Sequence, residues 1–490
     1  MMPHWSRRAA AGVVALALRD GLTRLVAFAG HLTLARVLAP ADFGAFAVVL
    51  LLTGLAELVG GLGLSAALVQ RPDPPDDRVA GAAFLVRLAA ALALAGALLV
   101  AVPALAGPFQ LPPSAPLLAL IVVPALPLTA LALAPEFQLE RALRFDRLAL
   151  ADGARVVVGQ IVAVGLAWAG VGVAALAGGY LAGALAWVAA LYVLSPWRPR
   201  LAWHPATVRR LLGFGGPVVS QQIIHLVKDQ MAPALGAPLF GSTAVGYLDW
   251  AGKLARTAAA PSTLANRVAF PAYARLQQDP AAMRQALPLA LRWSALLSFP
   301  LLAVLGGLGP ELTHYLYTDQ WLPALPALYL LALHAALGVL PDLLMPALLA
   351  AGRLRAALAV SIGWTVLAWT LALALAALVG YAGIAAAYAL STAVAAGALL
   401  RLVPVRLSDA LRAGGPAGLG AFLAISAMRG VVSMLGSSIP AILTALLLGL
   451  AVYALTVLAV QGRTLWRDVR PLTADRRPLT ADRRLTTADR

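Results

Sequence analysis

Long runs of Leu, Ala, Val and Gly with few charges recur along this chain from about residue 11 to about residue 461. Each run can supply the roughly 20 residues that an α-helix needs to cross a hydrocarbon core of about 30 Å. The runs lack the apolar–polar alternation of membrane β-barrel strands, so helices are the spanning structure that satisfies their backbone hydrogen bonds. Composition agrees, since 61% of the 490 residues are apolar and 12% are charged. The sequence therefore predicts an all-α polytopic membrane protein.

The apolar runs divide into about fourteen expected transmembrane helices, whose connections alternate in charge. The expected helices are 11–38, 43–68, 79–106, 116–134, 149–168, 172–194, 208–236, 243–269, 288–308, 324–351, 356–379, 382–400, 416–435 and 440–461. Every second connection carries arginine, and the others have neither Lys nor Arg. Because basic loops stay in the cytoplasm, both termini are expected there. The first run has no small-residue cleavage pattern, so it is expected to be a permanent helix and not a signal peptide.

Several kinds of chemistry are not expected from this sequence. The chain has no cysteine, which excludes disulfides, thiolate metal sites and cysteine nucleophiles. No carboxylate pair, histidine cluster or phosphate-cradling glycine loop is recognisable, so we expect neither an enzyme nor a cofactor. The net charge of +16 is explained by the arginines of the cytoplasmic loops, so no nucleic-acid partner is expected.

Four stretches of the chain carry a family resemblance. The stretch 34–71, which begins LARVLAPADFGAF, resembles the amino-terminal signature of the polysaccharide-transporter branch of the multidrug/oligosaccharidyl-lipid/polysaccharide exporter superfamily, the Wzx-like flippases. Similar stretches follow at 135–149, 214–255 and 268–279. The resemblance implies two bundles of six helices with a cavity between them that opens alternately to each side. It also implies, in many branches, a further helix pair.

The sequence contains a trace of an internal duplication. ARVLAPADFG at 35–44 aligns without a gap with APLFGSTAVG at 237–246, at an offset of 202. Both copies follow a helix that starts in the cytoplasm, which predicts parallel repeats related by an axis along the membrane normal. The expected parts are an N-terminal six-helix lobe at 1–197, a C-terminal six-helix lobe at 198–412, two appended helices at 413–461 and a disordered cytoplasmic tail of heptad repeats at 462–490.

Charged and polar residues form stripes on three expected helices, at spacings that place them on one helix face. The stripes are Asp20, Arg24 and His31; Gln221, His225 and Asp229, with Lys228 beside His225; and Asp249, Lys253, Arg256, Thr263 and Arg267. Glu57 stands alone in its helix. A charge at the bilayer centre costs roughly 2.5 to 3.5 kcal/mol, so the stripes are predicted to face a wet cavity.

The charges of the stripes predict an anionic cargo, because cations outnumber carboxylates. The candidates for binding an anionic headgroup are Arg24, Lys228, Lys253 and Arg256, since guanidinium and ammonium groups suit pyrophosphate oxygens. The candidates for cavity polarity or for coupling to an ion, H+ or Na+, are Asp20, His31, Glu57, Gln221, His225, Asp229 and Asp249. Pro233 and Pro261 are candidate hinges because proline breaks the helical hydrogen-bond ladder. The alternative for the charged residues is structural pairing between packed helices.

With the resemblance, these stripes favour a flippase in the bacterial inner membrane. Its expected cargo is an undecaprenyl-pyrophosphate-linked oligosaccharide for surface polysaccharide, which includes O-antigen of lipopolysaccharide, capsule and exopolysaccharide. Expected partners are this lipid-linked oligosaccharide, the bilayer, and a polysaccharide polymerase or export machinery. The alternative is a MATE-like cation-coupled drug or metabolite antiporter, which would need acidic groups facing its lumen.

Overall fold

The computed structural model describes residues 4–61, 63, 64, 68, 77–195, 223, 224, 226–276 and 279–474. Within these residues the chain is helical and forms no strand, and eleven helices are long and apolar enough to cross a membrane. The prediction of an all-α polytopic membrane protein is confirmed. The predicted total of fourteen spans stays a prediction, because much of the expected helix 208–236 lies outside the described residues.

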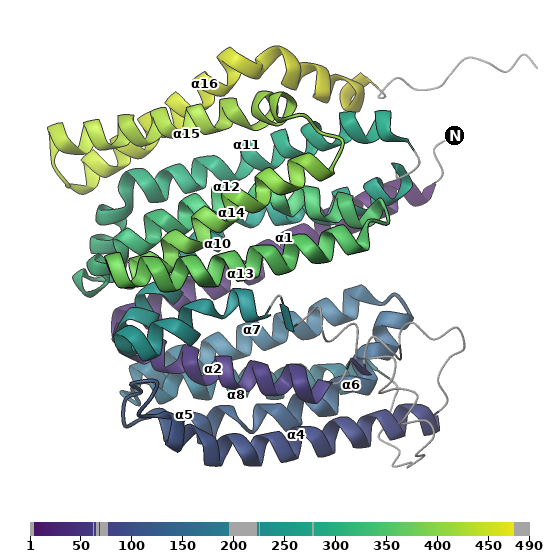
Figure 1. The fold of residues 1–490 in the computed structure, drawn as a ribbon, viewed down its shortest axis with the longest axis vertical. Helices are drawn as coiled ribbons and strands as arrows, with labels where there is room; N and C mark the ends of the chain where they lie inside the picture. The colour runs from purple at the N-terminus through teal and green to yellow at the C-terminus, as the bar shows by residue number, and fades with distance from the viewer. Residues whose placement is uncertain are drawn as a thin grey trace, which may run out of the picture. The chain divides into compact units, whose positions relative to one another are not determined.

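The helices follow the predicted runs closely (Figure 1). Their bounds are α1 His4–Val37, α2 Pro40–Gly61, α4 Asp77–Leu105, α5 Ala115–Val122, α6 Ala125–Arg141, α7 Phe145–Trp168, α8 Ala174–Leu194, α10 Met231–Leu276, α11 Pro280–Leu312, η1 Thr313–Tyr317, η2 Asp319–Ala324, α12 Leu325–Ala350, α13 Leu354–Val379, α14 Ala382–Leu402, α15 Leu407–Leu435 and α16 Ile439–Ala474.

Two of the predicted helix bounds differ from the structure. The expected helix 116–134 lies within one candidate span, 115–141, which Pro124 divides into α5 and α6 because it has no N–H to continue the ladder. Helix α16 continues to Ala474, so a disordered tail cannot begin at 462. The side chain of Asp468 forms an ion pair with Arg292 of α11, a tertiary contact that anchors the extension.

Contacts group the chain into two compact units. Unit 1 comprises residues 1–257 and 309–403, and unit 2 comprises residues 258–308 and 404–490. The chain passes from one unit to the other inside α10, inside α11 and after α14. The lobes predicted at 197/198 rest on the internal duplication, and this grouping does not test them.

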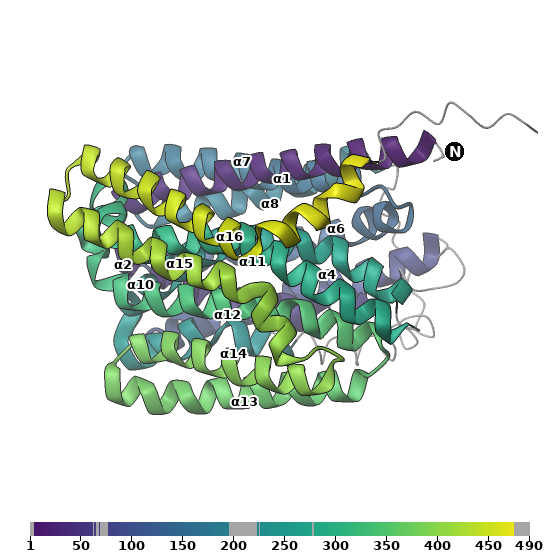
Figure 2. The ribbon, with the colours of Figure 1, turned by 90° about the horizontal axis from the view of Figure 1, so that it is seen from above.

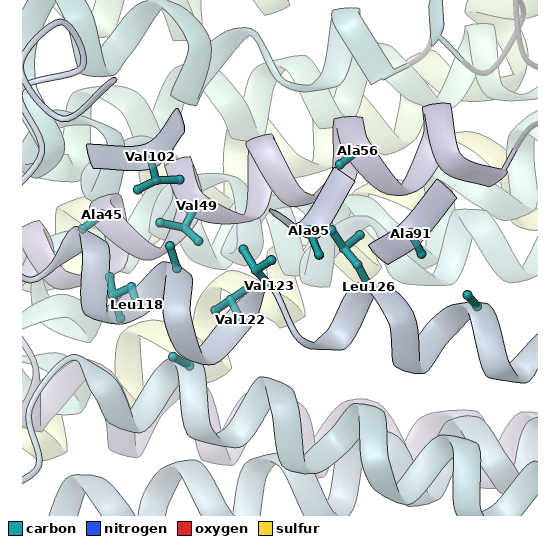
Figure 3. Close-up of a cluster of buried hydrophobic side chains, with 13 residues drawn as sticks. Ala45, Val49, Ala56, Ala91, Ala95, Val102, Leu118, Val122, Val123 and Leu126 are labelled. Atoms are coloured by element: carbon teal, nitrogen blue, oxygen red, sulfur yellow. The ribbon is translucent and has the colours of Figure 1, made fainter. Parts of the chain in front are cut away.

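In unit 1, α2, α4, α5, α6 and α8 share an apolar core (Figure 3). Val49 of α2, Val122 of α5 and Leu126 of α6 are fully or almost fully buried there. Alanines fill most of the remaining positions, and such small residues let transmembrane helices approach closely. Helix α7 contacts both α1 and α8, and the three helices overlap along the upper edge of Figure 2. The rest of unit 1 includes α12, α13 and α14, in which α14 contacts the other two.

Unit 2 contains α15 and α16, which pack against each other and are tied to α11 by polar contacts. The hydroxyl of Tyr453 donates a hydrogen bond to the carbonyl of Leu296 at 3.0 Å. Arg429 donates to the carbonyl of Gly307 at 3.2 Å. Arg429, a charge in the middle of an apolar helix, therefore has an interhelical partner.

Candidate functional site

Helices α2 and α10 cross in unit 1 with their backbones in contact. A Cβ atom placed on Gly44 would lie 1.7 Å from the carbonyl oxygen of Ser242. A Cβ atom on Gly246 would lie 1.9 Å from the carbonyl oxygen of Pro40. Real Cβ atoms do not approach so closely, so only glycine fits at either position. We call these four residues the glycine crossing.

The glycine crossing joins the two copies of the internal repeat. At the offset of 202, Pro40 aligns with Ser242 and Gly44 with Gly246. Gly44 contacts the equivalent of Pro40, and Gly246 contacts Pro40 itself, so the contact is reciprocal. Reciprocal contacts of this kind arise when a two-fold axis relates two surfaces. The contact has the reciprocity that a pseudo-two-fold relation between the predicted repeats would give, and the repeats themselves stay a prediction.

A glycine also sets where the second copy's helix begins. Gly241 has φ +79° and ψ 176°, so α10 is two helices joined at a kink. This backbone region is open essentially only to glycine. The helix after the kink starts at Ser242, which aligns with Pro40, the first residue of α2. Both repeats therefore begin a helix at the same register.

The turns near the glycine crossing are tied to one another by hydrogen bonds. Gln320 of η2 donates to the carbonyls of Ala35 and Leu38, each at 3.2 Å, and the indole of Trp321 donates to Ala35 at 2.8 Å. The side chain of Gln110 donates to the carbonyl of Pro238 at 2.8 Å. We call the end of unit 1 formed by the turns 38–39, 106–114, 313–324 and 380–381 the turn end. These turns lack Lys and Arg, and η2 packs on the start of α2 through the contact of Trp321 with Phe43.

The predicted stripes of α1 and of α10 meet next to the glycine crossing. Asp249 and Lys253 form an ion pair at 2.7 Å, and the Lys253 ammonium lies 5.8 Å from the centroid of the Phe43 ring. His31 packs against the same ring at 5.4 Å and interacts electrostatically with both charges of the pair. Arg256, one turn further along α10, is exposed. The structure thus brings His31, Asp249 and Lys253 together, and their role in binding or coupling stays a prediction.

Lys228 lines a pocket of about 260 Å³, which we call the lysine pocket. Its lining residues are Ile224, Lys228, Pro341, Asp342, Met345, Pro346, Ser361, Trp364 and Thr365. The Lys228 ammonium lies 4.0 Å from the centroid of the Trp364 ring and 3.9 Å from the carboxylate of Asp229. A cation over an aromatic face is favourable. The pocket offers an ammonium, two hydroxyls and a carboxylate beside one aromatic ring, which suits a polar ligand group.

Two residues of the lysine pocket, Asp342 and Trp364, are not among the functional residues predicted from the sequence. Asp342 is a lone acid inside an apolar helix, and such a residue is a signal for function by itself. The criterion that singles out Glu57, an isolated acid in an apolar helix, applies equally to Asp342. Trp364 gives no comparable signal, because a tryptophan in a transmembrane helix is ordinary and only the fold brings it to Lys228.

The predicted hinge at Pro233 is held by a side chain from α14. Proline has no N–H, so the carbonyl of Asp229, four residues earlier, loses its helical partner. The hydroxyl of Tyr388 lies 3.1 Å from that carbonyl and 3.1 Å from the carbonyl of Lys228, and it can donate to either. Tyr388 therefore replaces the bond that Pro233 removes.

Replacing Tyr388 by phenylalanine is expected to lower the free energy of unfolding by about 1 kcal/mol, the typical net value of one hydrogen bond. Adding Pro233→Ala restores an N–H that can reach the Asp229 carbonyl, so the loss should be smaller in that background. Unfolding in detergent of the two single variants and the double variant measures the coupling. Equal losses in both backgrounds would show that Tyr388 does not act through Pro233.

Glu57, the lone charge of its expected helix, is partly buried and lies beside other charges at the edge of the apolar core of unit 1. It lines a cavity of about 10 Å³ with Arg87 of α4 and Thr129 of α6. Arg87 interacts electrostatically with Glu57 and with Glu136 of α6. Removing Arg87 would leave the carboxylates of Glu57 and Glu136 without their cation in apolar surroundings. The arrangement favours the structural interpretation of Glu57 at least as much as ion coupling.

The other predicted residues are placed less fully. Arg24 is exposed on α1, and Pro261 lies within α10. Gln221 and His225, and the side chains of Asp20, Thr263 and Arg267, lie outside what the structure describes.

Sequence comparison finds one protein family that matches more than half of the chain. The profile of the family described as "Polysaccharide biosynthesis protein" matches residues 33–326. The succinoglycan biosynthesis transport protein ExoT of Rhizobium meliloti is 28% identical over 304 residues, which cover 61% of this chain and 60% of that protein. The teichuronic acid biosynthesis protein TuaB of Bacillus subtilis is 25% identical over 317 residues, 61% of this chain and 62% of that protein. The matches thus span about three fifths of each relative.

Structural comparison finds the same fold in known transporters. An inward closed conformation of the lipid II flippase MurJ superposes with a TM-score of 0.74 at 15% identity, over 93% of this chain and 99% of that chain. An inward-facing multidrug resistance MATE family transporter of the MOP superfamily superposes with a TM-score of 0.58 at 16% identity, over 85% and 99%. At such low identity the likeness extends to the fold alone.

Proposed function

The chain belongs to the polysaccharide biosynthesis protein family, and from that premise we propose that it flips an undecaprenyl-pyrophosphate-linked oligosaccharide across the bacterial inner membrane. The cargo would serve surface polysaccharide synthesis, and both termini would lie in the cytoplasm. One observation carries the proposal: two basic residues lie one turn apart on α10, the first of them 5.8 Å from the Phe43 ring beside the glycine crossing. These residues are Lys253 and Arg256.

The headgroup would bind by exchanging partners with a carboxylate. Lys253 holds Asp249 at 2.7 Å, and its side chain is 40% exposed, so a pyrophosphate can reach it. Phosphate oxygens accept charge-assisted hydrogen bonds as well as a carboxylate does. Arg256 is exposed on the same helix face and would add a guanidinium. The ion pair with Asp249 therefore holds the Lys253 ammonium in place for an anion.

During transport the helices would bend at two interruptions of their hydrogen bonding, which lie where the chain passes from one compact unit to the other. The first passage falls between Thr257 and Ala258, and Pro261 frees the carbonyl of Thr257 from its helical bond. The second falls after Leu308, whose φ of −119° and ψ of 15° interrupt α11. We propose that both breaks bend during alternating access, with Pro261 as the hinge in α10.

The alternative function is a MATE-like antiporter, since such transporters share the fold. A cationic cargo needs carboxylates free to face it. Asp249 is paired with Lys253, and Asp229 lies 3.9 Å from Lys228, so cations offset both acids. This balance favours an anionic cargo. We propose neither an enzymatic reaction nor a cofactor, and we keep a polymerase or export machinery as the expected partner.

The test is transport of a fluorescent undecaprenyl-pyrophosphate oligosaccharide in vesicles that contain the purified protein. We expect Arg24→Ala, Lys253→Ala and Arg256→Ala each to lower transport about 10- to 100-fold, because a charge-assisted hydrogen bond contributes about 1.5 to 3 kcal/mol. Lys253→Arg should keep most of the activity.

The matched control is Arg355→Ala, which removes an exposed arginine near the start of α13 and should leave transport unchanged. Full transport by Arg24→Ala, Lys253→Ala and Arg256→Ala would mean that these residues form structural pairs and do not bind the cargo. A wild-type protein that moves ethidium and not the lipid would support the antiporter.

A further inference from the structure

Seven rings from six elements or turns gather at the turn end. This aromatic cluster consists of His31, Phe43, Tyr247, Trp250, Tyr317, Trp321 and Tyr381. Trp321 is its centre: its ring stacks on Trp250 with centroids 5.4 Å apart and meets Phe43 edge-on at 5.4 Å. Tyr317 meets Trp250 edge-on at 5.2 Å. The cluster belongs wholly to unit 1.

Three polar atoms of the cluster are buried without a hydrogen bond. They are the indole nitrogen of Trp250, the hydroxyl of Tyr317 and Nε2 of His31, and none has a partner among the described residues. Trp250 is 0% and Tyr317 2% exposed. More than nine tenths of buried polar groups in proteins are paired, and an unpaired one bears its full desolvation cost. In this arrangement the aromatic cluster therefore does not satisfy these three polar atoms.

A separation of α2 from α10 within unit 1 would uncover the cluster. Phe43 adjoins Gly44, and Tyr247 adjoins Gly246, so the rings flank the glycine crossing. Trp321 contacts both of these rings from η2. If α2 and α10 separate, the ring faces and the three unpaired atoms lose their cover together. A ligand that arrives in the open state could then bond those atoms.

We propose that the aromatic cluster is a glycan-binding surface on the exit path of the cargo. A pyranose has an apolar C–H face and a rim of hydroxyls, while Trp and Tyr offer an apolar face and a polar handle. Sugar rings stack on Trp250 and Trp321, and sugar hydroxyls bond the indole of Trp250, the hydroxyl of Tyr317 and Nε2 of His31. A hydroxyl both donates and accepts, so it suits His31 in either tautomer. This inference rests on the proposed function.

Two variants remove one unpaired atom each and keep an aromatic ring, which is smaller in the second variant. Tyr317→Phe deletes the hydroxyl, and Trp250→Phe deletes the indole N–H. The control is Tyr453→Phe in unit 2, because that buried hydroxyl already donates to Leu296. All are compared in vesicles with two cargos: undecaprenyl pyrophosphate bearing a single galactose, and the same lipid bearing a neutral tetrasaccharide of glucose and galactose.

The expected result is selective. Tyr317→Phe and Trp250→Phe should slow the tetrasaccharide lipid about 3- to 10-fold, the range of one or two hydrogen bonds. The same two variants should move the monosaccharide lipid at a rate within about twofold of wild type. The control Tyr453→Phe should move both lipids at the wild-type rate. Tyr317→Phe should also unfold no earlier than wild type, since it removes an unpaired buried hydroxyl, whereas Tyr453→Phe should unfold earlier.

The other outcomes overturn the inference and separate it from the proposed function. Equal slowing of both cargos would give the aromatic cluster a structural role only. Unchanged rates for both would mean that the unpaired atoms never meet the glycan. A wild-type protein that moves neither lipid would overturn the flippase proposal and this inference with it.

Discussion

Replacing Gly246 by alanine is expected to abolish transport by holding the turn end open. The added Cβ would lie 1.9 Å from the carbonyl oxygen of Pro40, a backbone atom that cannot turn aside like a side chain. Overpacking of this kind costs roughly 1 to 3 kcal/mol or more. In a protein that exchanges between a closed and an open state, this penalty falls on the closed state alone. The closed population should fall about 10- to 100-fold.

Gly44→Ala should give the same result, because its Cβ meets the Ser242 carbonyl at 1.7 Å. This equality is a direct consequence of the reciprocal contact. The matched control is Gly54→Ala in the same helix, where no heavy atom lies within 4 Å of the new methyl group. That variant should keep transport, since alanine suits a helix better than glycine does.

Cysteine labelling measures the opening directly. The chain has no cysteine, so Ser242→Cys provides a single thiol at the glycine crossing without background. A membrane-impermeant maleimide should label it faster in the Gly44→Ala and Gly246→Ala backgrounds than in wild type or Gly54→Ala. Unchanged labelling together with normal transport would mean that the helices do not need this contact to close.

Replacing Arg87 by methionine is expected to cause the largest loss of stability. Arg87 is a partly buried cation that interacts electrostatically with Glu57 and Glu136 beside the apolar core of unit 1. Removing one member of a buried charge network typically costs about 3 to 5 kcal/mol, because the remaining charges have no partner. The variant should therefore unfold well below wild type in detergent, or accumulate poorly in the membrane.

A second substitution separates a structural role from a coupling role. Glu136→Gln removes one of the two carboxylates that Arg87→Met leaves behind, so the double variant should recover part of the lost stability. Arg355→Met, at an exposed position, is the control and should be neutral. If Arg87→Met folds normally and transport alone is lost, the charges act in coupling and the structural interpretation of Glu57 is wrong.

The sequence located the charges well and their partners less well. Spacing along a helix placed Asp249 and Lys253 on one face, and the structure pairs them at 2.7 Å. A spacing rule acts within one helix, so it could not find that His31 of α1 lies beside this pair. It also could not find that Trp364 lies under the ammonium of Lys228, because that contact joins segments more than a hundred residues apart.

Hydropathy by itself determined that this chain is helical and crosses a membrane, because apolar runs of this length have no other way to satisfy their backbone in lipid. The alignment of 35–44 with 237–246 likewise needs the sequence alone. Only the tertiary structure decided that Gly44 and Gly246 face each other's repeat across a backbone contact. Only the tertiary structure shows, likewise, that the unpaired polar atoms of the aromatic cluster are buried. The physical reason is that glycine is required where a Cβ atom would clash with a neighbouring backbone, and here that backbone belongs to a distant part of the chain.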